Sequence, residues 1–179
     1  MNSEIKIFVS GDFCPIHRME NLLETSDINQ VFGELAEQIE SADLAITNLE
    51  CPLTLSNKPI KKTGPALKGS PKTSLFLKSA GFNLVTLANN HIMDFGKQGL
   101  LDTIQNLEKN KLHFVGAGLN GNKASSIFFF NKNGVKVAIV NIAENEWSTT
   151  NNDNEGANPI NPVINFQQIR EAKESADKV

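Results

Sequence analysis

Three short segments of the chain place acidic, amide and imidazole side chains directly after runs of apolar residues. These candidate site residues are Asp12 after the first run, Asn48 and Glu50 after the second, and Asn89, Asn90, His91 and Asp94 after the third. Carboxylate and amide oxygens suit a hard divalent cation, and an imidazole supplies a nitrogen ligand or a proton. A phosphoester needs its anionic oxygens neutralised and a water activated, and a metal ion can do both. The residue types therefore predict a metal-dependent site for a phosphoester or a related polyanionic substrate.

Each segment taken alone also has a structural interpretation. An aspartate after a strand is often a turn or N-cap residue, and Asn89-Asn90 can form a turn with asparagine in the left-handed region. Three such segments at the ends of three successive strands favour a site, because ligands bind outside the carboxyl ends of strands in open parallel sheets. We therefore expect Asp12, Glu50 and the Asn90-His91 pair to lie close together.

The elements that must position these residues alternate along the chain through Val115. Apolar runs predict strands at residues 5–10, where the strand should be buried, and at residues 44–47, 84–87 and 112–115. Amphipathic spacing predicts helices at 28–39, capped by Asp27, between Ser70-Pro71 and Gly81, and around 100–107. This alternation implies right-handed crossovers and a mainly parallel sheet, so the predicted fold class is α/β.

The segment that follows Val115 predicts a hairpin and a loop. Asn133-Gly134 stands between apolar runs at residues 127–130 and 135–142, and an Asn-Gly pair in that setting is a strong hairpin signal. Residues 149–162 are rich in asparagine and proline and predict a surface loop.

A final helix is expected after this loop, with Asn165 as its cap. Its apolar positions are Phe166, Ile169, Ala172 and Ala176. The helix ends in Glu-Ser-Ala-Asp at residues 174–177, and the same tetrapeptide precedes the second strand at residues 40–43. Because a strand follows the first of these tetrapeptides, we expect another strand to begin near Val179, after the second.

Composition and charge place the chain in the globular, soluble class. Hydrophobic residues make up 40% of it, and 17 basic and 20 acidic residues give a formal net charge of -3. Without a basic patch, nucleic acid is not an expected partner, and the adjacent Lys61 and Lys62 are expected on a solvated loop. No apolar run could span a membrane and no signal peptide is visible, so a cytoplasmic location is expected.

Several other residues have weaker claims to a site. His17 could line the cleft, but a loop side chain is the simpler interpretation, and His113 is most simply structural. Glu144 and Glu146 could be cleft acids, although a solvated loop is favoured for them. Trp147 either caps the core or faces a ligand.

The two cysteines, Cys14 and Cys51, are too few for a disulfide framework. Each adjoins a candidate acidic ligand, so the two thiols should be near one another, with Cys14 at the cleft. We expect small buried residues rather than metal ligands, because a free cysteine usually behaves as a small hydrophobe.

Four stretches carry a family resemblance: Gly11-Asp12, Asn48–Leu53, Gly81–Gly96 and Gly116-Ala117-Gly118. Together they resemble the CapA family of poly-γ-glutamate capsule synthesis, most specifically in the Ala-Asn-Asn-His-x-x-Asp-x-Gly stretch. That family is similar to the calcineurin-like metallophosphatases. The resemblance implies their fold, a β-sandwich flanked by helices, with a dinuclear metal site at the strand ends.

The resemblance also implies roles for matching residues. Asp12, Glu50 and Asn90 match metal ligands. His91 matches the histidine that acts on the leaving group or stabilises charge on the transferred phosphoryl. Divalent metal ions, of a kind the sequence does not specify, are therefore the implied cofactors.

The sequence departs from the superfamily pattern at two points. Cys14 stands where a histidine is usual, and no histidine occurs after His113. The resemblance therefore implies that residues 1–179 are the N-terminal part of one metallophosphatase-like domain. Its metal site would be incomplete, and an open edge or apolar face would lower its solubility.

Two functions stay open at this point. The first is a metal-dependent phosphoester hydrolase, if the full-length site is complete. The second is a non-catalytic binding or assembly factor for the poly-γ-glutamate synthesis or export machinery. A complete ligand set favours the first, and an incomplete set favours the second.

Overall fold

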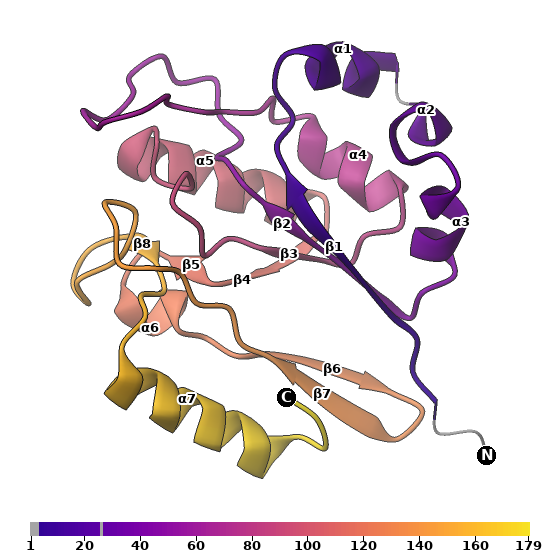
Figure 1. Ribbon diagram of the computed structural model, residues 1–179, viewed down its shortest axis with the longest axis vertical. Coiled ribbons are helices and arrows are strands. Elements are labelled where there is room, and N and C mark those ends of the chain that lie inside the picture. Colours follow the sequence, from indigo (N-terminus) through magenta and orange to yellow (C-terminus); the bar gives the residue numbers. More distant parts are fainter. Residues whose placement is uncertain (1–3, 26) are drawn as a thin grey trace.

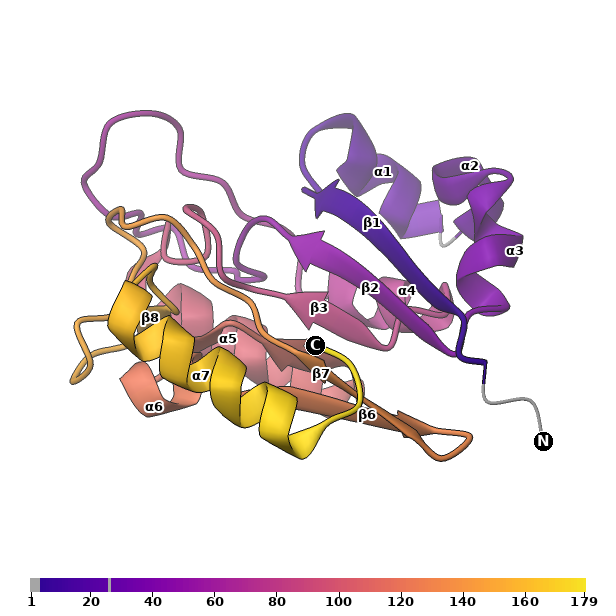
Figure 2. The same ribbon diagram turned by 60° about the horizontal axis from the view of Figure 1, so that its bottom comes forward.

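The computed structural model describes residues 4–25 and 27–179 and arranges them in layers (Figure 1). Its strands are β1 (Ile7–Phe13), β2 (Leu44–Leu49), β3 (Leu84–Thr86), β4 (His113–Val115), β5 (Ala117–Gly118), β6 (Phe128–Lys132), β7 (Val135–Ile139) and β8 (Gly156–Ala157). Its helices are α1 (Arg18–Thr25), α2 (Ile28–Phe32), α3 (Leu35–Glu40), α4 (Thr73–Ser79), α5 (Gly96–Lys109), α6 (Gly121–Ala124) and α7 (Pro162–Ser175). Helices α1 to α5 cover one face of a parallel sheet, and the β6–β7 ribbon lies on the other side (Figure 1, Figure 2).

The parallel sheet has the order β1-β2-β3-β4, so each strand lies beside the one that precedes it in sequence. Alternate side chains point to opposite faces of such a sheet. On the helix side, Ala45 and Val85 belong to the main core, together with Leu77 of α4 and Leu100 of α5. On the ribbon side, a second core consists of Leu44, Ile46, Leu84 and Val115 with Phe128, Phe130 and Ile139. These two cores confirm the predicted layered α/β fold.

The first strand differs from its prediction in burial and length. It was expected to be buried, but β1 is an edge strand with Ile7 39% and Val9 68% exposed. The ribbon-side core begins at β2, so these two side chains have no layer over them. The pairing with β2 shifts register between Val9 and Asp12, and it then continues with Asp12 opposite Asn48.

The helix predicted at residues 28–39 is divided in two. Asp27 caps α2 as expected, since its Oδ1 accepts a hydrogen bond from the Gln30 amide at 3.1 Å. Gly33 then adopts a φ of 53°, which ends α2, and α3 follows. Helix α1, before them, was not predicted. The third predicted helix, around residues 100–107, is confirmed as α5.

The hairpin prediction is confirmed. Strands β6 and β7 pair antiparallel around Asn133-Gly134, where both residues have positive φ. Asparagine and glycine tolerate the left-handed region that a tight hairpin turn requires.

Helix α7 is capped and oriented differently from the prediction. Asn161, not Asn165, is the N-cap, and its Oδ1 accepts from the amides of the first turn. Asn165 and Gln168 are buried, whereas Phe166 is 66% exposed. The inner face is polar because it packs on a loop with backbone groups to satisfy: Gln168 Nε2 donates to the Ser125 carbonyl at 2.6 Å.

The two Glu-Ser-Ala-Asp segments end in the same hydrogen-bonded junction. Asp43 Oδ2 accepts from the Lys6 amide at 2.9 Å, and the Asp43 amide donates to the Lys6 carbonyl at 2.8 Å. Asp177 repeats both contacts with Lys136 of β7, each at 2.8 Å. Lys178 then forms a parallel bridge to β7, where the sequence predicts the start of a strand.

The N-terminal half of α7 exposes several apolar side chains. Val163 is 69% exposed, and Phe166 and Ile169 lie on the same exposed side. Among the described residues, no helix combines the length and the apolar character needed to cross a bilayer.

Candidate functional site

Asp12 and Glu50 meet at the carboxyl ends of β1 and β2, where they share one hydrogen-bond donor. Asn48 Nδ2 donates to Asp12 Oδ1 at 2.8 Å and also to Glu50 Oε2. The Asn48 Oδ1 atom accepts from Thr86 Oγ1 at 3.1 Å and from Asn89 Nδ2 at 3.3 Å, which fixes the orientation of the amide. We call Asp12, Asn48 and Glu50 the carboxylate cluster.

The surroundings of Glu50 disfavour its charged form. The pKa of Glu50 is raised above its usual value, first by burial and then by the neighbouring charge of Asp12. The hydrogen bond from Asn48 offsets only part of this effect. A positive charge placed between the carboxylates would therefore be stabilised.

The two thiols lie next to the carboxylate cluster, as expected from the sequence. Both cysteines are free; Cys51 is buried and Cys14 is half-buried. A hydrogen bond from the Cys51 thiol lowers the pKa of Cys14, and the same contact, with burial, raises the pKa of Cys51. The two sulfurs are therefore neighbours.

Asn89 connects the carboxylate cluster to the segment that carries His91. Its Nδ2 donates to the Leu49 carbonyl at 2.8 Å, and its Oδ1 accepts from the amides of His91 at 3.1 Å and Ile92 at 2.9 Å. These three contacts to backbone groups shape the turn, but neither Asn89 nor Asn90 has a positive φ, so the left-handed turn expected from the sequence is not observed. Asn90 differs, because none of the described hydrogen bonds involves its side chain; its carbonyl accepts from Trp147 Nε1 at 2.9 Å.

His91, Asp94 and Lys62 form a buried charged group, which we call the charged triad. His91 Nδ1 lies 2.7 Å from Asp94 Oδ2, and Lys62 Nζ bonds Asp94 Oδ1 and lies 3.2 Å from His91 Nδ1. The side chains of Lys62, His91 and Asp94 are 3%, 16% and 0% exposed. The expectation of a solvated Lys62 is wrong, because Asp94 supplies a buried counter-charge that the sequence alone does not reveal.

Glu144 and Glu146 line a cavity of about 290 Å³ together with Asn89 and Asn90. Glu144 is exposed, in agreement with a solvated loop, but Glu146 is not. The Oε2 atom of Glu146 is shielded from solvent and has no hydrogen-bond partner within the described part of the chain. Trp147 holds this loop against Asn90 through its indole N–H. The partial burial of Glu146 differs from the solvated loop position that the sequence favours.

The remaining histidines stand apart from these groups. His17 is exposed, with a φ of 53°, in the turn before α1. His113 in β4 is exposed, and its ring centroid lies 5.3 Å from that of Phe128. Both fit the structural interpretation.

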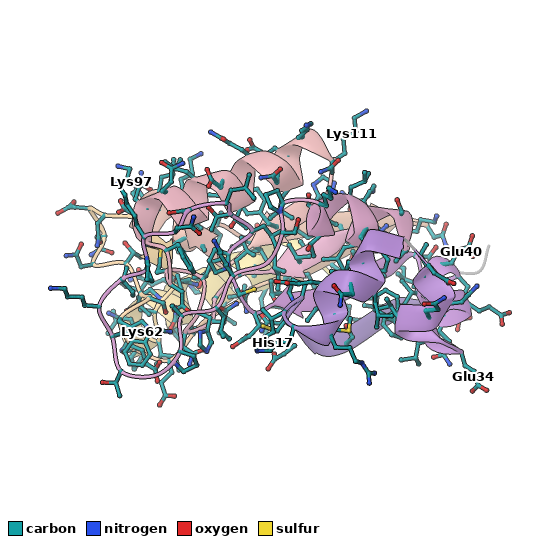
Figure 3. All side chains as sticks on the ribbon, turned by 90° about the horizontal axis from the view of Figure 1, so that it is seen from above. His17, Glu34, Glu40, Lys62, Lys97 and Lys111 are labelled. Atoms are coloured by element: carbon teal, nitrogen blue, oxygen red, sulfur yellow. The ribbon has the colours of Figure 1, made fainter. Side chains whose placement is uncertain are left out.

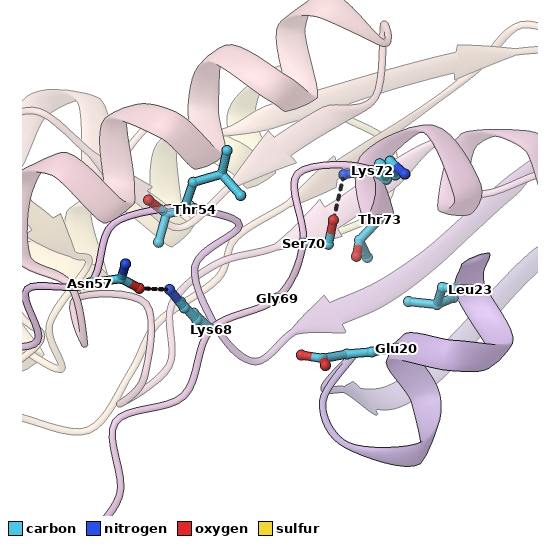
Figure 4. A pocket seen from close by; sticks show the side chains of 10 residues that line it. Glu20, Leu23, Thr54, Asn57, Lys68, Gly69, Ser70, Lys72 and Thr73 are labelled. Carbon is cyan, nitrogen blue, oxygen red and sulfur yellow. Dashed lines mark hydrogen bonds between the residues drawn. The ribbon is translucent and has the colours of Figure 1, made fainter.

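Another cavity, of about 400 Å³, lies between α1 and the segment that leads into α4 (Figure 4). Glu20 lies on one wall and Lys68 on another, and Lys68 Nζ already donates to the Asn57 side chain at 2.8 Å. Thr73 Oγ1 has no partner among the described residues. The lining includes none of the seven candidate residues of the strand ends, so we do not assign the site to this cavity.

The chemistry of the carboxylate cluster fits a divalent cation only in part. Within the described residues, no group of three or more histidine, cysteine, aspartate or glutamate side chains could hold a metal ion. Mg²⁺, however, is commonly bound by one or two carboxylates, with waters and substrate phosphates as the other ligands. Asp12 and Glu50 match that partial set.

Comparisons with known proteins give one family and several relatives. The family model described as "Bacterial capsule synthesis protein PGA_cap" matches residues 6–179. The "Capsule biosynthesis protein CapA" of Bacillus anthracis is 27% identical over 178 residues, covering 97% of this chain and 43% of that protein. The "PGA biosynthesis protein CapA" of Bacillus subtilis (strain 168) is 29% identical over 174 residues, covering 94% of this chain and 46% of that protein.

Another match extends over a shorter part of the chain. A "Probable polyglutamine synthesis accessory protein" of Mycobacterium tuberculosis is 33% identical over 89 residues, which is 49% of this chain and 23% of that protein. The chain spans less than half the length of these curated relatives.

Proposed function

The chain belongs to the bacterial capsule synthesis protein family PGA_cap, and from this premise we propose that it contributes the phosphoester-binding site of a metal-dependent hydrolase. In this proposal, Asp12, Glu50 and Asn90 bind a divalent cation, and His91 acts on the phosphoryl group. The names of the relatives refer to capsule, PGA and polyglutamine synthesis. The proposed substrate is accordingly a phosphoester, or a related polyanion, of that process.

The carboxylate cluster is the observation that carries the proposal. Asp12 and Glu50 come from adjacent strands and share the single amide donor of Asn48. Burial and the charge of Asp12 raise the pKa of Glu50, so the charged form of Glu50 is disfavoured in the absence of a cation. A divalent cation relieves that penalty, and it would also neutralise phosphoryl oxygens and activate a water.

His91 is suited to proton donation or charge stabilisation. An ionised Asp94 can only accept hydrogen bonds, so a hydrogen bond across the 2.7 Å contact requires the proton on His91 Nδ1, and the Lys62 ammonium at 3.2 Å then does not donate to that nitrogen. None of the described hydrogen bonds engages Nε2, which is therefore the ring nitrogen available to a substrate. A histidine imidazole can donate a proton to a leaving group as a general acid.

A second function is favoured by the incomplete ligand set. Because the described residues contain no group of three metal-binding His, Cys, Asp or Glu side chains, the same crevice could serve a non-catalytic factor. Such a factor would bind a polyanion or assemble with the poly-γ-glutamate synthesis or export machinery. Cation binding without turnover in the full-length protein would favour this second function.

Fluorescence offers a direct test of cation binding. Trp147 is the only tryptophan and there is no tyrosine, so intrinsic emission reports on one residue beside Asn90. Titration with Mn²⁺ or Co²⁺ should quench this emission, and combined Asp12→Asn and Glu50→Gln changes should abolish the quenching. As the control, Glu34→Gln with Glu40→Gln removes two exposed acids of the α2–α3 region and should leave the quenching intact (Figure 3). Equal quenching in all three proteins would refute the proposed cation site.

The role of His91 needs a separate test in the full-length protein. His91→Ala should lower turnover of a generic phosphomonoester by about 10²–10⁴-fold, because a general acid contributes that much. The Mn²⁺ quenching should persist in this variant. Loss of cation binding without a separate catalytic defect would instead make His91 a ligand.

A further inference from the structure

Lys62 lies in a long loop, residues 54–72, that connects β2 to α4 without regular helix or strand in its central part. Figure 3 shows Lys62 on this loop, far from Glu34 and Glu40 at the other end of the molecule. The neighbouring Lys61 is exposed, whereas the Lys62 side chain is only 3% exposed. A buried ammonium is costly unless it is paired, so a specific partner has to hold this part of the loop.

Asp94 is that partner, and it also binds the loop through backbone groups. Asp94 Oδ1 accepts from Lys62 Nζ, and Asp94 Oδ2 accepts from the Leu67 amide at 2.7 Å. The Asp94 carbonyl accepts from the Ile60 amide at 2.9 Å. Three contacts from one stretch of the loop therefore converge on one fully buried residue.

The same carboxylate orients His91. Asp94 Oδ2 lies 2.7 Å from His91 Nδ1, and Lys62 Nζ, which bonds Asp94 Oδ1, lies 3.2 Å from the same nitrogen. On its outer side, the ammonium lies 5.1 Å from the centre of the Trp147 ring. Lys62 thus joins the loop, the Asp94 carboxylate and the imidazole into one packed unit.

We propose that Lys62 is a positioning residue for His91: its ammonium fixes the 54–72 loop and the Asp94 carboxylate, and thereby holds the imidazole with Nδ1 inward and Nε2 free. The proposal rests on the proposed function, in which His91 acts through that free nitrogen. Lys62 need not touch the substrate. Lys62 acts on His91 through Asp94. Because Lys62 holds Oδ1 of the Asp94 carboxylate, Oδ2 is the oxygen that contacts the His91 ring and aligns it.

A simpler role for Lys62 would be to neutralise Asp94 and stabilise the loop. The two roles predict different orientations and tautomers of the His91 imidazole when Lys62 is replaced. If Lys62 only stabilises the loop, the ring keeps its tautomer and its single orientation. If Lys62 positions the ring, Asp94 gains rotational freedom and the ring samples more than one state.

Nuclear magnetic resonance of the histidine rings separates these roles. The chain has only three histidines, so the ring nitrogens of His91 can be assigned in the described protein. Lys62→Met removes the ammonium, and Lys61→Met removes the same charge from the exposed neighbour as the matched control. We expect one Nδ1-protonated state of His91 in the parent and in Lys61→Met, and a mixture of states or loss of the Nδ1 proton signal in Lys62→Met.

Amide hydrogen exchange in the same samples reports on the loop. Exchange at Ile60 and Leu67 should accelerate by about tenfold or more in Lys62→Met, as expected for local opening, and should not change in Lys61→Met. If Lys62→Met does not fold, Lys62→Gln keeps an N–H donor for Asp94 without the charge. It should then shift the His91 ring signals in the same direction by a smaller amount.

Unchanged His91 ring signals in a folded Lys62→Met or Lys62→Gln protein would overturn the proposal, even if the loop exchanges faster. The result does not depend on cation binding or turnover. Altered ring signals without any hydrolase activity would retain Lys62 as the residue that positions His91 while refuting the hydrolase. Unaltered ring signals together with hydrolase activity would refute Lys62 as the residue that positions His91 and would retain the hydrolase.

Discussion

Glu146 has one carboxylate oxygen that is shielded from solvent and unpaired within the described residues. Burial of an unpaired polar atom is destabilising, and the cost is greatest when the group carries charge. Without divalent cations, Glu146→Gln should therefore raise the free energy of unfolding by about 1 kcal/mol. Urea denaturation measures this change, with Glu144→Gln on the exposed neighbour as the control. A loss of stability in Glu146→Gln would show that the oxygen has a favourable partner.

At the scale of residues, the sequence was informative for residues near the end of a strand, although Asp12 and Asn48 lie inside β1 and β2 rather than after them. Asp12 and Glu50 end adjacent strands, and parallel pairing alone brings them together. Lys62 could not be found in this way, because it lies in an irregular loop and its partner Asp94 is 32 residues away. A long-range ion pair leaves no periodic pattern in the sequence. The roles assigned to Asp12, Glu50, Asn90 and His91 stay predictions.

At the scale of elements, the Asp43 junction makes a prediction about acid stability. The hydrogen bond from the Lys6 amide is the main cause that lowers the pKa of Asp43 in the folded chain below its usual 3.8. A depressed carboxyl pKa gives stability that is present above the unfolded pKa and is lost as pH falls through the folded pKa. Asp43→Asn should therefore flatten the loss of stability below about pH 4.

Thermal unfolding between neutral pH and acid measures this effect. Asp153→Asn, on an exposed loop, is the control and should keep the acid dependence of the parent. An Asp43→Asn protein with the same acid dependence as the parent would contradict the role of the junction.

Helices were harder to predict than strands, for two local reasons. Apolar spacing continues from α2 into α3, but Gly33 breaks the backbone between them. In α7, Phe166 and Ile169 of the apolar stripe are exposed, whereas Ala172 is buried. Asn165 and Gln168 are turned inward because the layer beneath offers carbonyl and amide groups rather than apolar side chains. Periodicity in the sequence shows which residues share one face of a helix, but it does not show which part of the protein that face packs against.

At the scale of the whole molecule, the exposed apolar side chains in the N-terminal half of α7 predict association. Val163 and Phe166 are 69% and 66% exposed on one helix, and contiguous exposed apolar surface commonly mediates contacts between proteins. The chain should therefore associate as its concentration rises. Val163→Ser with Phe166→Ser should shift it toward the monomer in sedimentation velocity runs. Leu55→Ser, at a 78% exposed loop position, should not. A parent chain that stays monomeric at all concentrations would contradict this prediction.

During synthesis, the ribosome delivers the strands of the parallel sheet in the order in which they lie side by side. Each new strand can therefore pair at once with the edge left by the strand before it. The ribbon-side residues Leu44, Ile46, Leu84 and Val115 lack a cover until β6 and β7 emerge. At roughly 5–20 residues per second, that interval lasts on the order of seconds. For that time the nascent chain presents a preformed apolar surface on which a chaperone could act.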